Sequence, residues 1–534
     1  MPETTSPGEL RCRGIPSSLG IAAMACAMAA AAYLSLPRFD DAIIWFWLDD
    51  TPNHIDPANV DRRVMGLLWR FLASTGRFWE IGAALNVLAT LGTALSTFVL
   101  WQRMFPGRTA WGVVAATFSA APILYELQET LTPVYQLQLS IVYLAALSTW
   151  PGGRFAGAFL SAVAATVICV VGSVTEYTLS ATVPVAFLIL CRTWTVPGAV
   201  RRCGLVAVGF LALGTVASYA LLRFAADDGF RPSLLPSVGW EYFWRRGWTI
   251  PFKMVDALTS VFGGALCREV ADFSINSWRG ASAAIAAAVA TLMIAIDLRP
   301  RTTNDSAPAG APRLIELGQL AAAVALGLFP LFCMRLAPHD EGAYSRFFAG
   351  VHPLSGCAVA ALLIAVCRAR LQLALSIGLV FVSTFAAFND AGRWYEHRRD
   401  MNRVGRAIRP HLAAGFTLIL FEPESSGYKS FGRWSYDVEL SALVMTNWTR
   451  EERLRAWVIP AGNSQAIPRA PADRTRIIHP PSDANEHWRF EWRFRGVERA
   501  ADVERVLLVG FPSKESARIL DITQGRVVFD GPTE

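Results

Sequence analysis

Residues 15–41 read IPSSLGIAAMACAMAAAAYLSLPRFDD, a stretch that is free of charge up to Arg38 and ends in the adjacent carboxylates Asp40 and Asp41. Its apolar part, 15–36, matches the length of about 20 residues that a helix needs to cross a bilayer. It is longer than the apolar region of a typical cleaved signal peptide. We therefore predict a retained first transmembrane helix, followed directly by an acidic pair.

Similar apolar stretches recur along the chain. The sequence is 53% hydrophobic and 17% charged, whereas soluble domains carry about 25% charged residues. Because lipid offers the backbone no hydrogen bonds, such stretches form helices. We predict a mainly α fold, a polytopic membrane helical bundle of about eleven transmembrane helices. The predicted spans are 15–36, 79–101, 109–125, 134–150, 155–172, 179–190 (beginning near 174), 202–224, 281–296, 315–336, 351–367 and 371–388.

The charges of the short loops give these spans an orientation. With a cytoplasmic N-terminus, the arginines fall in the inner loops, which is the usual bias of membrane proteins. This topology places the chain in the cytoplasmic (inner) membrane, with its C-terminal part outside. The outer loops carry Asp40, Asp41, Asp49, Asp50, Glu126, Glu129, Glu176, Asp227, Asp228, Asp340 and Glu341.

The sequence changes character after the last predicted span. Residues 393–408 are typical of a polar helix that leaves the membrane, and short β-prone runs separated by turn residues follow. These runs are 416–421, 455–459, 488–494, 505–511 and 527–529. We predict a cytoplasmic segment 1–14, a transmembrane domain 15–390, and an extracytoplasmic soluble domain 391–534 that is β-rich or α/β.

Ionisable residues border several predicted spans on the outer side. Such groups are costly next to lipid unless they are paired or hydrated, so they favour a functional site. Each one alone also fits a boundary marker of a span, and the acidic pair alone fits a solvated helix end. The candidates are Asp40 and Asp41 after the first span, Glu126 and Glu129 after the third, Glu176 at the sixth, and His339, Asp340 and Arg346 between the ninth and tenth.

The residue types of these candidates suggest their chemistry. A carboxylate of the acidic pair suits a general base facing a lipid-borne substrate, because proximity to lipid can raise its pKa toward neutral pH. The guanidinium of Arg346 suits a phosphate, and its alternative is an interfacial anchor. His339 with Asp340 and Asp41 leaves a divalent cation open as a cofactor, although these residues match no defined metal spacing.

Several other function classes are not supported. The net charge of +6 does not indicate nucleic acid, since the arginines lie in short loops where they orient helices. The sequence has no GxxxxGK[ST], GxSxG or HExxH pattern, which argues against ATP-driven transport, serine hydrolysis and zinc proteolysis. None of the nine cysteines forms a CxxC pair, so a metal–thiolate site is not expected.

Four stretches resemble the GT-C superfamily of membrane glycosyltransferases, which includes protein O-mannosyltransferases and bacterial lipid-A sugar transferases. They are RFDDAIIWFW at 38–47, DRRVMGLLWRFL at 61–72 with NVLATLGTALSTFVLWQRMFP at 86–106, SVTEYTLSATVPVAFLIL at 173–190, and EGAYSRFFAGVHPLSG at 341–356. The likeness covers about residues 15–400, and it departs from the family pattern at Thr175, where a basic residue is usual.

The resemblance implies a transferase that uses a polyprenyl-phosphate-linked sugar as donor. Its acceptor is a glycan, lipid or protein on the outer face of the lipid bilayer. Asp41 is the implied base, and Asp40 orients the loop or helps to hold a cation. The residues implied to bind substrate are Glu126, Glu129 and Glu176, with Arg346 on the departing phosphate.

Two other functions remain open at this point. A lipid-linked saccharide flippase or transporter also needs many spans and outer carboxylates, but it should place several ionisable groups in the middle of the membrane. A non-catalytic membrane scaffold of the same fold is the other, because the SVTEY stretch is altered. Substitution of Asp41 by asparagine separates an enzyme from a scaffold.

Overall fold

A computed structural model of the chain describes seventeen ranges of residues. They are 15–34, 78–106, 108–125, 133–151, 157–172, 175–196, 198–225, 278–298, 314–331, 350–367, 369–422, 444–445, 448–460, 475–479, 487–494, 497–513 and 516–532. These residues are mainly helical with a small C-terminal sheet, which confirms the predicted fold class at that level. They divide near Trp394 into two compact units, here called the helical unit and the sheet unit.

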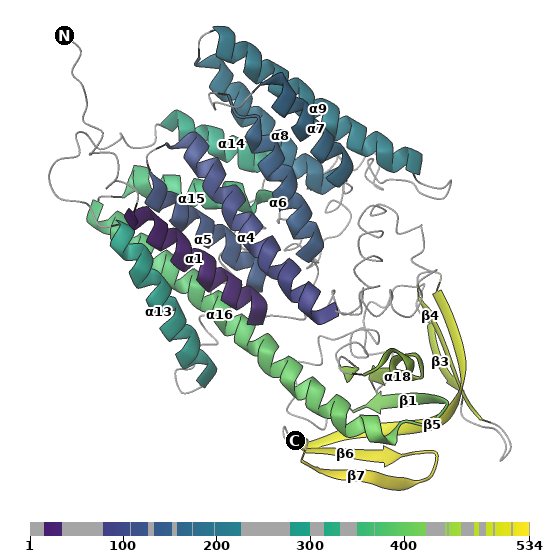
Figure 1. Ribbon diagram of the computed structural model, residues 1–534. Helices are drawn as coiled ribbons and strands as arrows, with labels where there is room; N and C mark the ends of the chain where they lie inside the picture. The colour runs from purple at the N-terminus through teal and green to yellow at the C-terminus, as the bar shows by residue number, and fades with distance from the viewer. Residues whose placement is uncertain are drawn as a thin grey trace, which may run out of the picture. The chain divides into compact units, whose positions relative to one another are not determined.

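Eleven helices of the described residues fall at the eleven predicted stretches (Figure 1). Their apolar composition explains their length, since each begins and ends near a charged or turn-forming segment. They are α1 (Ile15–Leu34), α4 (Phe78–Met104), α5 (Thr109–Tyr125), α6 (Pro133–Ser148), α7 (Ala158–Val171), α8 (Thr175–Trp194), α9 (Gly198–Ala225), α13 (Trp278–Leu298), α14 (Leu314–Leu331), α15 (His352–Val366) and α16 (Ala369–Ile408).

Four of these helices are individually long and apolar enough to cross a membrane. Their apolar segments are Ala83–Met104, Gly198–Ser218, Trp278–Ile296 and Leu371–Gly392. The other seven have apolar segments of 10–17 residues among the described side chains, although α1 and α8 are each 20 residues long as whole helices. The number of described helices that meet the length criterion is therefore four, below the predicted number of about eleven. An apolar segment of 17 residues spans only about 26 Å as an α-helix.

Small residues allow the helices to approach one another closely. A Cβ added to Gly356 of α15 would lie 2.5 Å from the carbonyl oxygen of Ala115 in α5. A Cβ added to Gly214 of α9 would lie 2.6 Å from the carbonyl oxygen of Ala165 in α7. Such contacts are typical of helix packing in membranes, where small residues let backbones meet. A larger side chain at either glycine would push two helices apart.

Helix α16 continues without a break past the predicted span. The sequence predicted a span at 371–388 and a separate polar helix at 393–408, but one helix covers Ala369–Ile408. Between the two parts stand Asn389, Asp390, Ala391 and Gly392, and none of them is a proline that would break the helix. The two predicted helices are thus one element, which contributes residues to both units.

The sheet unit contains seven described strands, and a long strand lies at the centre of the sheet. Strand β1 (Phe416–Phe421) pairs in parallel with β2 (Ala456–Pro460) and with β5 (Val497–Ser513). On its other side β5 pairs antiparallel with β4 (Trp488–Phe494) and then with β6 (Ser516–Asp521). Strand β3 (Thr475–His479) pairs with β4, and β7 (Arg526–Pro532) with β6, both antiparallel. The sheet is therefore mixed.

An aromatic group fills the core of this sheet. Phe490 of β4 is fully buried, and its ring stacks on Phe416 with centroids 6.2 Å apart. The centroid of the Trp457 ring, on β2, lies 6.3 Å from the centroid of the Phe490 ring. Phe490 and Trp457 are buried, and Phe416 is half-buried beside them. The runs predicted at 416–421 and 488–494 match the observed strands residue for residue.

Candidate functional site

The end of α14 and the beginnings of α8 and α15 meet at one end of the helical unit. Gly327 marks this point in the last third of α14. A Cβ added there would lie 3.1 Å from the carbonyl oxygen of Ser180 and 3.5 Å from Cγ2 of Val351. Ser180 is in the second turn of α8, and Val351 directly precedes α15. We call this end of the helical unit the site end.

Helices α1, α4 and α5 join the same end. Gly356, near the beginning of α15, packs on Ala115 and Ser119 in the middle of α5. The amide of Asn86, near the beginning of α4, donates a hydrogen bond of 2.7 Å to the carbonyl oxygen of Ala32 at the end of α1. Because α4 and α5 are connected at the opposite end, α4 begins and α1 ends at the site end.

The beginning of α6 lies there as well. The side-chain amide of Gln138, in the second turn of α6, donates to the carbonyl oxygen of Val171 at the end of α7. A Cβ added to Gly172, which follows α7, would lie 3.0 Å from Cγ2 of Thr178 in the first turn of α8. The beginnings of α6 and α8 are therefore at the same end of the bundle.

The opposite end is defined by the connection between α4 and α5. The indole of Trp101 in α4 donates a hydrogen bond of 2.8 Å to the carbonyl oxygen of Arg108, which precedes α5. Burial lowers the pKa of the Arg108 guanidinium, and the charge of Glu316 acts against this shift. Glu316 is in the first turn of α14, so α5 and α14 begin at the same end. Consecutive helices thus alternate in direction here.

This packing gathers the attachment points of all candidate residues at the site end. Asp40 and Asp41 follow α1, Glu126 and Glu129 lie between α5 and α6, and Glu176 is in the first turn of α8. His339, Asp340 and Arg346 lie between α14 and α15. The six helices are successive neighbours, since α1 contacts α5, α5 contacts α15, α15 contacts α14, α14 contacts α8, and α8 contacts α6.

The candidate side chains themselves lie outside the described residues. This applies to Asp40, Asp41, Glu126, Glu129, His339, Asp340 and Arg346. Glu176 is within α8, where the structure places its backbone at the site end. The structure therefore brings together the helix ends that carry these residues. The distances among the carboxylates, the imidazole and the guanidinium stay predictions.

A buried polar seam, which sequence reasoning missed, runs between α4 and α6. The hydroxyls of Thr93 and Ser140 lie 3.4 Å apart, and the amide of Gln136 donates to the Thr93 hydroxyl. The hydroxyl of Ser96 donates to the carbonyl oxygen of Ser140 at 3.3 Å. All four side chains are buried. The spacing of three residues between Thr93 and Ser96 was the available sequence signal, because it places them on one helix face.

Helix α15 closes the polar seam. The thiol of Cys357 donates to the carbonyl oxygen of Thr97 at 3.6 Å, and the Tyr143 hydroxyl of α6 donates to the carbonyl oxygen of Gly350. His352, the first residue of α15, is fully buried. Gly350 lies beside Tyr143, which is well past the middle of α6, so the polar seam lies within the bundle.

A second group that sequence reasoning missed lies near the end of the apolar part of α16. Asn389 and Asp390 are 1% and 2% exposed, and Asp390 is the one buried carboxylate among the described residues of the helical unit. A Cβ added to Gly392 would lie 2.8 Å from Cγ of Arg279 in the first turn of α13. A charged residue within an apolar segment was the sequence signal for this group.

The described residues contain no group of three or more His, Cys, Asp or Glu side chains that could hold a metal ion. The residues that left a divalent cation open, Asp40, Asp41, His339 and Asp340, are outside those ranges. The described part adds a set of neutral hydroxyl and amide groups that are buried and bonded to one another between α4 and α6.

Comparison of the chain with protein-family models, with curated proteins and with solved structures found no match.

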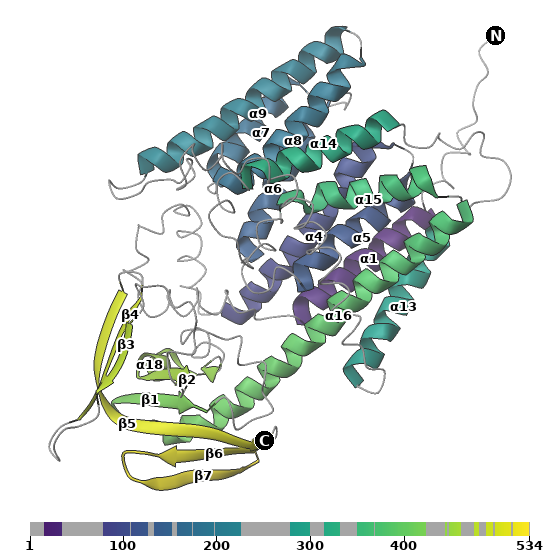
Figure 2. The same cartoon turned by 180° about the vertical axis from the view of Figure 1, so that it is seen from behind.

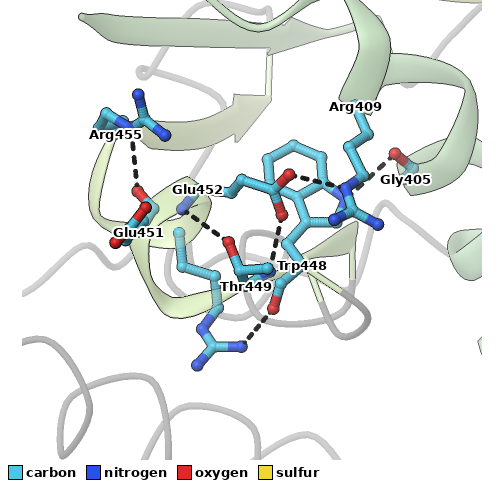
Figure 3. Close-up of polar contacts among 8 residues, drawn as sticks. Gly405, Arg409, Trp448, Thr449, Glu451, Glu452 and Arg455 are labelled. Atoms are coloured by element: carbon cyan, nitrogen blue, oxygen red, sulfur yellow. Dashed lines mark hydrogen bonds and ion pairs between the residues drawn. The ribbon is translucent and has the colours of Figure 1, made fainter. Parts of the chain in front are cut away.

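The most strongly connected polar cluster of the sheet unit fixes the end of α16 (Figure 3). Arg409 donates a hydrogen bond of 2.8 Å to Glu452, which sits in the short helix α18 (Arg450–Leu454). Thr449 and Glu452 form a reciprocal capping box at the start of α18. The indole of Trp448 donates at 3.1 Å to the carbonyl oxygen of Gly405 in α16. These bonds pair the polar groups of the cluster with one another. We therefore assign the cluster a structural role.

Replacing Thr449 by alanine is expected to destabilise the sheet unit by about 1 kcal/mol, the usual cost of losing an N-terminal helix cap. The backbone amide of Glu452 would lose its bond to the Thr449 hydroxyl. Hydrogen exchange of the full chain measures this as faster exchange of the α18 and β2 amides. Thr166→Ala, at an exposed hydroxyl on α7, is the control and should leave these amides unchanged. Equal exchange in both variants would remove the capping role.

The same cluster predicts a pH dependence. Desolvation alone would raise the pKa of the Glu452 carboxyl, but hydrogen bonds from Arg409 and Thr449 outweigh it and lower this pKa. A carboxyl whose pKa is lower in the folded state stabilises the fold above its unfolded pKa. That stabilisation is lost as the pH falls through the folded pKa. In Thr449→Ala the pKa of the Glu452 carboxyl is lowered less, so the loss should be smaller and should be complete at a higher pH, as a pH series of the same exchange measurement would show.

Proposed function

We propose that the chain is a membrane glycosyltransferase. It moves a sugar from a polyprenyl-phosphate donor to an acceptor outside the cytoplasmic membrane, with inversion. The observation that supports this proposal is the site end, where helices that precede or follow the candidate residues in the sequence are neighbours in space. A set of acids next to lipid on one side fits a reaction at the membrane surface.

The proposal includes eleven crossings of the membrane. The alternation of helix directions between the site end and the opposite end supports this number. Seven of the described apolar segments have at most 17 residues, but α1 and α8 reach 20 residues as whole helices, and a helix surrounded by other helices need not match the hydrocarbon thickness along its whole length. With an odd number of crossings and a cytoplasmic N-terminus, the site end and the sheet unit belong to the outer side.

The proposed reaction is a direct displacement at the anomeric carbon of the donor. Asp41 takes the proton of the acceptor hydroxyl, whose oxygen forms a bond to the anomeric carbon. The bond from that carbon to the phosphate oxygen breaks, and its electron pair leaves with the polyprenyl phosphate. Arg346 holds the departing phosphate, because a guanidinium matches phosphate geometry. Asp40 orients the first loop.

The remaining candidates bind the sugar and shape its surroundings. Carboxylates of Glu126, Glu129 and Glu176 accept hydrogen bonds from sugar hydroxyls, and His339 and Asp340 complete the outer rim.

The position of the buried charge favours a transferase over a transporter. A transporter is expected to place ionisable groups near the middle of the membrane. In the described helices the one buried carboxylate, Asp390, lies two residues before the end of the apolar segment Leu371–Gly392. The charge is thus near one surface, where a surface reaction needs it.

Purified full-length protein in liposomes tests the proposal. The liposomes are supplied with a panel of radiolabelled polyprenyl-phosphate sugars and with a cell-envelope extract as acceptor. We expect release of polyprenyl phosphate and transfer of label to the extract for at least one sugar. Movement of an intact labelled donor across the bilayer without cleavage would instead establish a flippase. Neither cleavage nor movement, from protein with native hydrogen exchange, would favour the scaffold.

A further inference from the structure

Three exposed arginines gather where α8 ends and α9 begins. They are Arg192 in the last turn of α8, and Arg201 and Arg202 near the beginning of α9. The guanidinium carbon of Arg201 lies 4.7 Å from the centroid of the Trp194 ring, which is a cation–π contact. Within the described part of the chain, none of the three arginines has an ion-pair partner. The α8–α9 turn therefore carries uncompensated positive charge beside an aromatic ring that is 70% exposed.

Close packing fixes the geometry of this turn. A Cβ added to Gly204 of α9 would overlap Cγ2 of Thr193 in the last turn of α8, and it would lie 3.8 Å from Cγ of Pro151, which follows α6. The hydroxyl of Thr195 donates a hydrogen bond of 2.8 Å to the carbonyl oxygen of Arg192, and the backbone amide of Thr195 donates to the same oxygen. The three arginines thus stand on helix ends that are packed against one another.

The face of α9 that continues from the arginines is apolar and exposed. Val206, Leu213 and Val216 follow Arg202 at helical spacing, which places them on one face. They are 42%, 59% and 63% exposed. Figures 1 and 2 show α9 at the periphery of the described helices in both views. Of the four segments that are long and apolar enough to cross a membrane, Gly198–Ser218 has the smallest buried share, 28%. In a membrane this face lies against lipid chains.

The α8–α9 turn lies at the end of the helical unit opposite the site end, because α8 begins at the site end. In the proposed topology this is the cytoplasmic side. The cytoplasmic leaflet carries anionic lipids, which attract basic residues next to a transmembrane helix. Positive charge at the surface with an exposed apolar face below it matches the two parts of such a lipid.

We propose that the α8–α9 turn binds an anionic phospholipid. Its phosphate lies at Arg192, Arg201 and Arg202, and its acyl chains run along the exposed face of α9. An apolar helix face alone fits any lipid, whereas the three arginines select a negatively charged headgroup. Trp194 holds the guanidinium of Arg201 at the membrane surface. The site depends on the membrane location of the chain and is independent of the transferase reaction.

A second copy of the chain fits this surface less well. Two copies related by a two-fold axis would bring the same patch of each copy together. Arg201 and Arg202 would then face the same arginines of the second copy, and like charges across an interface oppose association. A protein partner therefore enters the experiment as an outcome that contradicts the proposal.

Photolabelling in vesicles tests the proposal. A photoreactive amino acid replaces Val206, which lies one turn from Arg202 on the exposed face of α9. Leu292 of α13 is the matched control position, because it is an aliphatic residue that is 61% exposed in another of the four long apolar segments. The full chain is placed in vesicles of phosphatidylcholine that contain phosphatidylglycerol as a minor component. Mass spectrometry then measures the ratio of the two lipids attached at each position.

We expect phosphatidylglycerol to be enriched at position 206 over position 292 by at least about fivefold, the contribution of one basic residue near an anionic headgroup. Arg201→Gln combined with Arg202→Gln should lower this enrichment by at least the same factor. The double substitution of these two arginines by lysine should keep most of it, because lysine retains the charge.

A charge-matched control separates the turn from the charge of the whole chain. Arg406 on α16 and Arg526 on β7 are exposed arginines outside the turn. Arg406→Gln combined with Arg526→Gln removes the same charge and should leave the enrichment at position 206 unchanged. Hydrogen exchange of the α8 and α9 amides shows whether each variant keeps its fold. The comparison of positions 206 and 292 in the otherwise unchanged chain decides the question even if a glutamine variant does not fold.

Four results would overturn the proposal. In the first, positions 206 and 292 attach the two lipids in the same ratio. In the second, the enrichment survives Arg201→Gln with Arg202→Gln in a folded chain. In the third, the group at position 206 labels another copy of the chain in place of lipid. In the fourth, inorganic phosphate abolishes the enrichment while chloride of equal ionic strength does not, which would identify a site for the free ion. Since no reading depends on sugar transfer, failure of the transferase assay leaves this test valid.

Discussion

Replacing Asp41 by asparagine is expected to reduce transfer from the polyprenyl-phosphate sugar by about 10²–10⁴-fold, the usual contribution of a general base. Asparagine has nearly the same shape as aspartate but cannot take the proton of the acceptor hydroxyl. Binding of the donor should persist, because the proposed contacts to the sugar and phosphate come from other residues. Turnover and donor binding are measured separately, with the purified protein in liposomes.

Two further variants make this result specific. Asp40→Asn should have a smaller effect than Asp41→Asn, since Asp40 only orients the first loop in the proposed reaction. Asp502→Asn, at an exposed position on β5, should have none. Full turnover of Asp41→Asn would remove the residue from the role of base. Equal losses in both first-loop variants, together with lost donor binding, would instead indicate that the loop as a whole binds the donor.

Replacing Phe490 by alanine is expected to destabilise the sheet unit by about 3–5 kcal/mol. Its ring is fully buried and contacts both Phe416 and Trp457. The loss therefore combines lost burial with a cavity between β1, β2 and β4. Hydrogen exchange of the full chain should show faster exchange in these strands, while the amides of the helical unit serve as an internal reference.

Conservative and exposed substitutions provide the controls for Phe490. Phe490→Leu keeps most of the buried volume and should cost clearly less than alanine. Val527→Ala, at a position on β7 that is 42% exposed, should change the free energy of unfolding by less than about 0.5 kcal/mol. If all three variants exchanged alike, the aromatic group would not be the core of this unit.

The positions of the helices could be predicted because apolar segments in lipid have one way to satisfy the backbone. The predicted span 109–125 and helix α5 coincide, and α4 and α13 extend beyond their predicted spans by only a few residues. The continuity of α16 was missed, because a drop in hydropathy after Phe388 looks like a helix end although the backbone has no reason to stop. Hydropathy marks where lipid ends, and α16 continues beyond that point.

Some strands were predicted from β-prone runs, and others were missed. The run 488–494 became β4, whereas β3 and β6 were not predicted. β3 has the sequence TRIIH, and a five-residue strand with two adjacent isoleucines shows no alternation. The parallel pairing of β1 with β5 joins segments that lie more than 80 residues apart in sequence. Such pairing depends on tertiary packing, which local patterns do not contain.

The charged residues of the candidate site could be predicted from the sequence, but the polar residues packed between the helices could be predicted only in part. Acidic residues beside apolar stretches can be recognised in a sequence. The alternation of inner and outer loops predicts that these residues lie on one side of the membrane. The polar seam could not be predicted in the same way, because Thr93 and Ser140 resemble ordinary small residues of two separate helices. Only the packing of α4 against α6 brings their hydroxyls together.

The side of the membrane on which the sheet unit lies decides the whole account. Two reporters fused in turn after Glu534 measure it directly, one a phosphatase active only outside the cytoplasm and the other a fluorescent protein that matures only inside. The account predicts an active phosphatase and a dark fluorescent protein. A bright fluorescent protein with an inactive phosphatase would contradict an odd number of crossings from a cytoplasmic N-terminus, and with it the proposed reaction on the outer face.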